Sequence, residues 1–71
     1  MTPQEIAKVQ AYMRKRFANP RIQLVRRPQT DDSVEVVLDD EFLGVIFRDD
    51  EDGEVCYQLN MTILDIDLES F

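Results

Sequence analysis

The sequence predicts an α+β fold: an N-terminal helix packed on a four-stranded antiparallel meander sheet, with a short C-terminal turn or helix. Residues 1–17 carry apolar side chains at helical spacing, and the segment that follows contains four runs in which apolar and polar residues alternate. The connections between these runs are short and rich in Asp, Ser and Gly, which is typical of hairpins. A chain of 71 residues forms at most one domain, so we expect a single domain over residues 1–71.

The N-terminal helix is predicted from its cap and its apolar stripe. Thr2, Pro3 and Glu5 give the pattern of a capping box with proline at the first helical position. Asn19 and Pro20 should end the helix, because Asn tolerates a left-handed conformation and Pro cannot continue a helix. The side chains that repeat at spacings of three and four residues, and should face the sheet, are Ile6, Val9, Met13 and Phe17.

The four strands are predicted from the runs RIQLVRR, SVEVVL, FLGVIF and VCYQLNM. Register can be predicted by matching apolar faces, because a slip of one residue turns every side chain to the other face. Between the second and third runs, this rule pairs Leu38 with Leu43 and Val34 with Phe47, and it leaves residues 39–42 as the loop.

Two turns are considered between the third and fourth runs. A two-residue turn would place Phe47 opposite Gln58, whereas a three-residue loop, residues 51–53 with Gly53 left-handed, places Phe47 opposite Tyr57 and buries more apolar surface. We therefore predict the three-residue loop. The resulting inward face comprises Val34, Val36, Leu38, Leu43, Val45, Phe47, Tyr57, Leu59 and Met61.

The C-terminal segment TILDIDLESF, residues 62–71, fits two structures. Leu64, Ile66 and Leu68 alternate as in a strand, whereas Leu64, Leu68 and Phe71 fit one face of a helix. Thr62 with Asp65 resembles a capping box, which favours a short helical turn.

The outward face of the predicted sheet also carries apolar residues, namely Val25, Val37, Phe42 and Ile46. One amphipathic helix cannot cover both faces, and contiguous exposed apolar surface often marks an association site. We therefore predict a homodimer or another protein partner that contacts this face. The alternatives are cover by the C-terminal segment or apolar residues scattered over the surface.

Charge is distributed unevenly along the chain, whose net charge is -7. Residues 1–27 hold seven basic residues and one acidic residue, whereas residues 28–71 hold one basic and fourteen acidic residues. The two parts either neutralise each other in space or leave a basic partner-binding face. The candidate basic face comprises Lys8, Arg14, Lys15 and Arg16.

That basic face suggests an alternative function, an adaptor or nucleic-acid-binding domain that uses the N-terminal helix. In outline the predicted fold resembles the double-stranded RNA-binding domain. The isoelectric point of about 4.3 argues against nucleic acid, because nucleic-acid-binding domains usually have values above about 9. Nucleic acid is therefore not the expected partner.

The acidic segment RDDEDGEV, residues 48–55, does not fit the pattern of a calcium loop. If Gly53 stands at the sixth position of such a loop, Arg48 stands first and Leu59 twelfth, where acidic ligands are needed. The segment therefore predicts a solvated hairpin tip, and weak cation binding by residues 49–54 stays open.

Catalytic chemistry is poorly represented. The chain has no His, the side chain best suited to proton transfer near neutral pH. Its one cysteine, Cys56, therefore has no His to activate it. The chain also has only two glycines, which are too few for a phosphate-binding loop. We expect no enzyme, no cofactor and no metal site. A single cysteine fits a reducing compartment, and no apolar run approaches the length of a membrane span, so we expect a cytoplasmic protein.

Three stretches carry a family resemblance: TPQEIAKVQAYMRKRF, NPRIQL and DEFLGVIFRDDEDGEVCYQLNMTILDIDLE. Together they resemble a family of small alphaproteobacterial proteins, of about 70 residues, classed as a domain of unknown function. The resemblance implies a bacterial cytoplasmic protein that occurs as a stand-alone domain. It implies no activity, cofactor or site residue.

Overall fold

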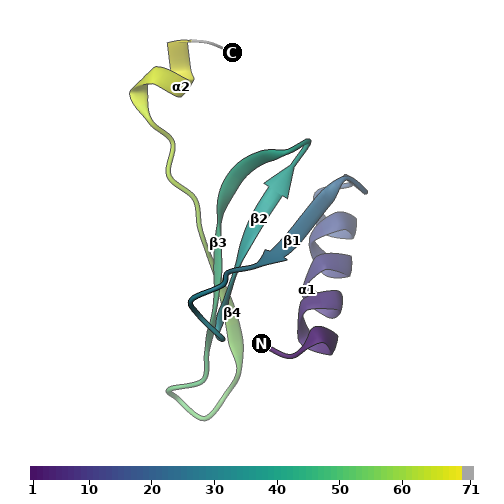
Figure 1. Ribbon diagram of the computed structural model, residues 1–71. Coiled ribbons are helices and arrows are strands. Elements are labelled where there is room, and N and C mark those ends of the chain that lie inside the picture. The colour runs from purple at the N-terminus through teal and green to yellow at the C-terminus, as the bar shows by residue number, and fades with distance from the viewer. Residues whose placement is uncertain (70–71) are drawn as a thin grey trace.

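The computed structural model describes residues 1–69 and has the predicted α+β architecture (Figure 1). The elements in chain order are α1 (Pro3–Arg16), β1 (Ile22–Arg26), β2 (Ser33–Leu38), β3 (Glu41–Asp49), β4 (Cys56–Asn60) and α2 (Asp65–Glu69). The strands form one antiparallel sheet in the order β1-β2-β3-β4, so the meander prediction is confirmed. The role predicted for Phe71 lies outside the described residues. No helix within residues 1–69 combines the length and hydropathy needed to cross a bilayer.

Helix α1 begins as predicted. The Thr2 hydroxyl accepts a hydrogen bond from the Glu5 backbone N–H at 3.1 Å, and the Glu5 carboxylate accepts one from the Thr2 backbone N–H at 3.0 Å. Its end differs in detail, because the left-handed residue is Ala18, with φ 51°, and not Asn19. The Asn19 side chain instead accepts a hydrogen bond from the backbone N–H of Arg21 and shapes the entry into β1.

The β2–β3 hairpin corrects the predicted register. Asp39 and Asp40 both have positive φ, 52° and 65°, and form a two-residue turn of the kind that joins tight hairpins. Leu38 therefore pairs with Glu41 and not with Leu43. A bulge then inserts one extra residue in β3, and beyond it Val34 pairs with Ile46.

The bulge decides which side chains of β3 face the helix. Leu43 still packs against the core, but beyond the bulge Ile46 points inward and Val45 and Phe47 point outward, opposite to the prediction. The β3–β4 pairing follows, with Phe47 opposite Gln58, the register that the prediction rejected. The connection spans residues 50–55, and within it Gly53 is left-handed at φ 82° as expected.

The core lies under α1 and over the first three strands. Its buried apolar side chains are Met13, Ile22, Leu24, Val34, Val36 and Ile46. Of the predicted helix stripe, Ile6 and Val9 pack at the edge of this core, whereas Phe17 is exposed. Every residue of β4 is exposed, so one helix covers only part of the inward face.

Gly44 is explained by a close approach of the chain at the end of β4. A Cβ at this position would lie 2.5 Å from the Asn60 carbonyl oxygen and 3.2 Å from Met61 Cα. Contacts this short do not occur at real Cβ atoms, so only glycine lets the chain pass there. After Met61 the chain leaves the body of the domain (Figure 1).

Candidate interaction surfaces

Helix α1 is attached to one edge of the sheet by two side chains. The Gln10 side-chain oxygen accepts a hydrogen bond of 3.0 Å from the backbone N–H of Leu24, and Arg14 Nε donates one of 2.7 Å to the carbonyl of Ile22. Both backbone groups belong to the edge strand β1. The helix is therefore held over β1, and its opposite flank borders an opening toward β4.

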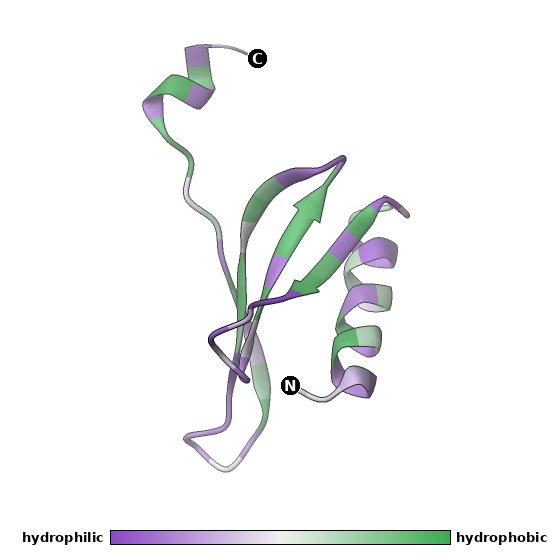
Figure 2. Cartoon of the chain, in the orientation of Figure 1, coloured by the Kyte–Doolittle hydropathy of each residue, from purple (hydrophilic) through white to green (hydrophobic). Residues whose placement is uncertain are grey.

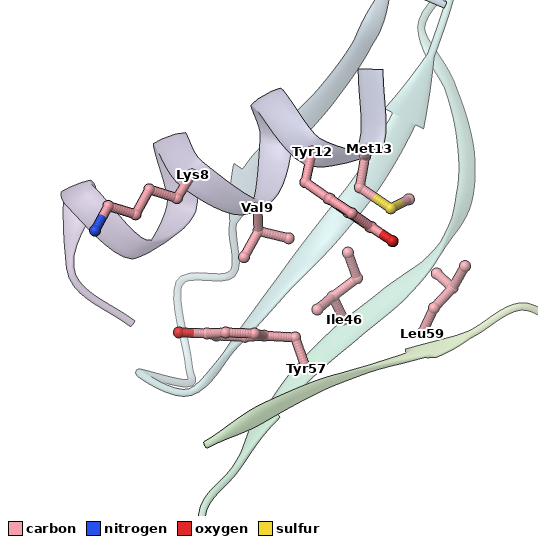
Figure 3. Close-up of a pocket in the computed structure, with 7 residues that line it drawn as sticks. All are labelled: Lys8, Val9, Tyr12, Met13, Ile46, Tyr57 and Leu59. Atoms are coloured by element: carbon pink, nitrogen blue, oxygen red, sulfur yellow. The ribbon is translucent and has the colours of Figure 1, made fainter. Parts of the chain in front are cut away.

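That opening is an apolar groove, which we call the α1–β4 groove (Figure 3). It has a volume of about 320 Å³, and Val9, Tyr12 and Met13 project into it from the helix toward Ile46 and Leu59. The full lining is Lys8, Val9, Tyr12, Met13, Ile46, Tyr57 and Leu59. Apart from the ammonium group of Lys8 and the two tyrosine hydroxyls, the lining side chains are apolar, which suits an apolar segment with acidic neighbours.

A polar cluster joins the start of α1 to β3 and β4. Glu5 Oε2 accepts hydrogen bonds from Arg48 Nε at 2.8 Å and from the Tyr57 hydroxyl at 2.6 Å. The Arg48 guanidinium also donates to Asp50 at 2.8 Å. This cluster brings together residues far apart in the sequence. Pattern analysis found Glu5 only as part of the capping box, and no motif links it to Arg48 or Tyr57.

The hydrogen bonds of this cluster shift its ionisation. The backbone hydrogen bond from Thr2, with the bonds from Tyr57 and Arg48, lowers the pKa of Glu5 to about 2. The bond to Glu5 raises the pKa of Tyr57 above its ordinary value, and the bonds to Glu5 and Asp50 raise that of Arg48. Near neutral pH all three groups therefore keep their protonation states, which is the behaviour of a structural clasp.

The outward sheet face contains three of the four predicted residues. Val25 and Phe42 are exposed there, and Val37 is half-buried. The prediction for Ile46 is wrong: this side chain is 2% exposed and lies in the core, because the bulge in β3 reverses the facing of the residues that follow. Phe47, 40% exposed, takes its place on the outward face.

The predicted basic face is divided by the structure. Arg14 is half-buried, and its Nε is bonded to β1, so its side chain points to the opposite flank of the helix from Lys8. Lys8 borders the α1–β4 groove, and Lys15 and Arg16 line a neighbouring hollow beside Tyr12. Within residues 1–69 these three cations make no ion pair. The chain's charge asymmetry is therefore only partly neutralised internally, by pairs such as Arg21 with Asp39.

Asp49, at the start of the acidic β3–β4 connection, already accepts hydrogen bonds from neighbouring residues. Asp49 accepts from the Glu51 backbone N–H at 3.1 Å and from the Gln58 side chain at 2.9 Å. Within the described part of the chain, no three acidic or cysteine side chains converge in a set that could hold a metal ion. Cys56 is exposed and has a free thiol.

The groove itself was missed at the level of the sequence. The prediction placed Tyr57, Leu59 and Met61 beneath the helix, whereas all three are exposed. The predicted elements did contain a signal for the groove. One helix about 10 Å across covers roughly two strands spaced about 4.8 Å apart, so it cannot cover a sheet of four strands. The spacing of Lys8 and Tyr12, on the flank of the apolar stripe, also places them on one side of the helix.

The segment after β4, residues 61–69, extends away from the domain and is called here the C-terminal arm (Figure 1). Figure 2 shows apolar and polar residues alternating along it. Its exposed apolar side chains are Met61, Ile63, Leu64, Ile66 and Leu68. Helix α2 is present as predicted, but Thr62 does not cap it; the Asp67 carboxylate accepts from the Leu64 backbone N–H instead, at 3.0 Å.

Comparison with known proteins places the chain in a family. Residues 5–67 match the family described as "Protein of unknown function (DUF3126)", and the chain belongs to this family. Neither the curated proteins nor the solved structures gave a match. The family description states no activity, so any function must be proposed from the surfaces described above.

Proposed function

We propose that this protein is a non-enzymatic protein-interaction module that self-associates through the outward face of its sheet. The observation that carries the proposal is surface area. The chain exposes 5812 Å², whereas a compact monomer of 8.3 kDa exposes about 4,600 Å². The excess of about 1,200 Å² exceeds the roughly 800 Å² that each partner contributes to a standard stable interface.

The shape of the chain supports the same proposal. Its radius of gyration is 13.0 Å, against about 11 Å for a compact domain of this length. On the outward face, Phe42 is 58% exposed and lies beside Val37, its pairing partner, while Phe47 lies farther along β3. Aromatic side chains at the centre of a patch are common anchors of protein interfaces.

The non-enzymatic part of the proposal rests on the titratable side chains of the chain. The chain has no His, and within residues 1–69 the carboxylate with a shifted pKa is Glu5, whose pKa of about 2 lies farther from neutral pH than the ordinary value. Neither feature suits proton transfer under physiological conditions.

An alphaproteobacterial cytoplasm is the setting we propose. The free, exposed thiol of Cys56 is compatible with a reducing compartment. Fractionation of cells that express the tagged chain tests this part, and recovery in the periplasmic or membrane fraction would contradict it.

Light scattering coupled to size-exclusion chromatography tests self-association. We expect a mass above that of the monomer for the wild-type chain at low and high salt, because apolar contacts tolerate salt. The double variant F42S/F47S should shift the chain toward monomer. At a concentration that keeps both chains monomeric, its thermal midpoint should match the wild type, since both side chains are exposed. A monomeric wild-type chain, or a variant that associates like the wild type, would overturn the proposal.

A second candidate function is an adaptor that docks an acidic protein or RNA on the basic side of α1. The observation in its favour is that Lys8, Lys15 and Arg16 make no ion pair within the described residues. Binding of this kind should weaken steeply with salt. Fluorescence anisotropy with a labelled RNA and with an acidic peptide, from low to high salt, tests it.

A further inference from the structure

We propose that the α1–β4 groove receives the C-terminal arm of a second copy of this chain. This inference rests on the self-association proposed above. It adds a further contact between the two copies, in which the arm of one copy binds the groove of the other. Each copy would give one arm and receive one, so the exchange closes on itself with two-fold symmetry.

The groove has the chemistry of a seat for an amphipathic segment. Val9 and Met13 line it on the side of α1, Leu59 lines it on the side of β4, and two tyrosine rings also border it (Figure 3). Leu59 is 46% exposed although it pairs directly with the buried Ile46, so the apolar surface of the core continues into the groove without cover. An apolar segment placed there would remove this surface from water.

The arm has the matching composition. Ile63, Leu64 and Leu68 are all more than half exposed. Leu64 and Leu68 are four residues apart, so they share one face of a helical turn. The acidic residues Asp65 and Glu69 lie next to this face, at the same spacing.

Charge complementarity identifies the arm as the occupant. The groove and the hollow beside it present three cations, Lys8, Lys15 and Arg16, on the side of α1 that faces away from β1. Helix α2 presents three anions, Asp65, Asp67 and Glu69. These two sets hold three of the seven basic residues in residues 1–27 and three of the fourteen acidic residues in residues 28–71.

The direction of the arm favours a second copy over the arm's own groove. After Met61 the arm runs away from α1, so α2 and the groove lie at separate ends of the molecule, whose longest dimension is 41 Å (Figure 1). Four residues, 61–64, separate β4 from α2, which leaves little chain for a reversal. The excess surface of about 1,200 Å² is also large enough for a contact made by groove and arm together.

A charge exchange between full-length chains tests the inference. One variant, K8E/K15E, has an acidic groove and an acidic arm; the other, D65K/E69K, has a basic groove and a basic arm. Each variant alone is mismatched, but in a mixed pair both contacts are complementary. Asp67 is kept because its carboxylate caps α2.

We expect each variant alone to associate on the order of tenfold more weakly than the wild type, because two exposed ion pairs become repulsive contacts. An equimolar mixture should recover wild-type affinity, and native mass spectrometry should show the mixed pair in excess over both self-pairs. If the mixture associates as the average of its two components, arm exchange between copies is excluded. An arm that folds back on the groove of its own chain would give this same result.

Two controls make the result specific. The variant E51K/E54K carries the same change of charge in the exposed β3–β4 connection, and it should not restore association with K8E/K15E. If it does, the effect is one of net charge and the proposal fails. At a concentration that keeps every chain monomeric, the circular dichroism and the thermal midpoint of each variant should match the wild type, because all the substituted side chains are exposed.

The failure of this inference differs from the failure of the proposed function. If F42S/F47S dissociates the wild-type assembly and the charge exchange has no effect, the outward face is the interface and the arm is not exchanged. If the charge exchange restores association and F42S/F47S has no effect, the arm contact stands and the outward face does not. A monomeric wild-type chain would overturn both.

Discussion

The two edge strands of the sheet, β1 and β4, are of equal length but differ in almost every other respect. In β1, Ile22 and Leu24 are buried and their backbone groups bond to Arg14 and Gln10 of α1. In β4, every residue is exposed, and the α1–β4 groove separates the strand from the helix apart from the hydrogen bond between Tyr57 and Glu5. An edge strand has unpaired backbone N–H and C=O groups along one side unless another element covers it. The fold covers one edge within the chain and leaves the other exposed, together with the groove and the arm.

The largest expected effect on stability is at Ile46, which is paired directly with Leu59 of the exposed edge strand. Replacing Ile46, which is 2% exposed, by Ala should lower the free energy of unfolding by about 2–5 kcal/mol, because it opens a cavity in the core. The matched variant Leu59→Ala should cost less than about 1 kcal/mol in the monomer, since its side chain is 46% exposed.

Urea titration at a concentration that keeps the chain monomeric measures both values. Equal losses at the two positions would mean that β4 belongs to the core, and the contrast between the edges would be lost.

A smaller effect is expected where α1 holds the closed edge. Gln10→Ala removes the acceptor for the backbone N–H of Leu24 and should cost about 0.5–1.5 kcal/mol. Hydrogen exchange of the Leu24 amide should become faster in the variant. Gln58→Ala is the matched control on β4, where the side chain makes an exposed hydrogen bond to Asp49, and it should change stability little. An unchanged Leu24 exchange rate in Gln10→Ala would show that the bond does not hold the edge.

The smallest effect is the pH dependence of the clasp between α1 and β4. The folded state lowers the pKa of Glu5 from 4.5 to about 2, so the ionised carboxylate stabilises the fold. This contribution is complete above the ordinary pKa of 4.5 and is lost as the pH falls toward about 2.

Chemical denaturation between about pH 6 and pH 2 should show a shallower acid-induced loss in Glu5→Gln than in the wild type. Glu54→Gln, at an exposed position, should follow the wild-type curve. Identical curves for wild type and Glu5→Gln would show that the clasp contributes nothing to stability.

Local signals predicted the elements well. The capping box of Thr2 and Glu5 and the left-handed glycine at position 53 are present as expected. Such features depend on a few neighbouring residues, so the local sequence is sufficient to specify them. The candidate surface residues Val25, Val37 and Phe42 also lie on the outward face.

The register predicted for β3 was wrong, and the error also changed the register predicted for β4. Strict alternation was assumed along β3, but the tight turn at Asp39 and Asp40 and the bulge near Gly44 break it. Ile46 and Phe47 consequently exchange faces, and the partner strand β4 shifts with them. Because the side-chain period of a strand is two residues, one extra residue is enough to reverse a face.

The sequence by itself determined the order and type of the elements, the start of α1 and the opposite charges of the chain's two parts. The tertiary structure alone decided which face Ile46 occupies, that Arg14 bonds to β1 and that Glu5, Arg48 and Tyr57 meet. The physical reason is range: caps and turns are specified by residues a few positions apart. Register, helix placement and the width of the groove depend on how whole elements pack against one another.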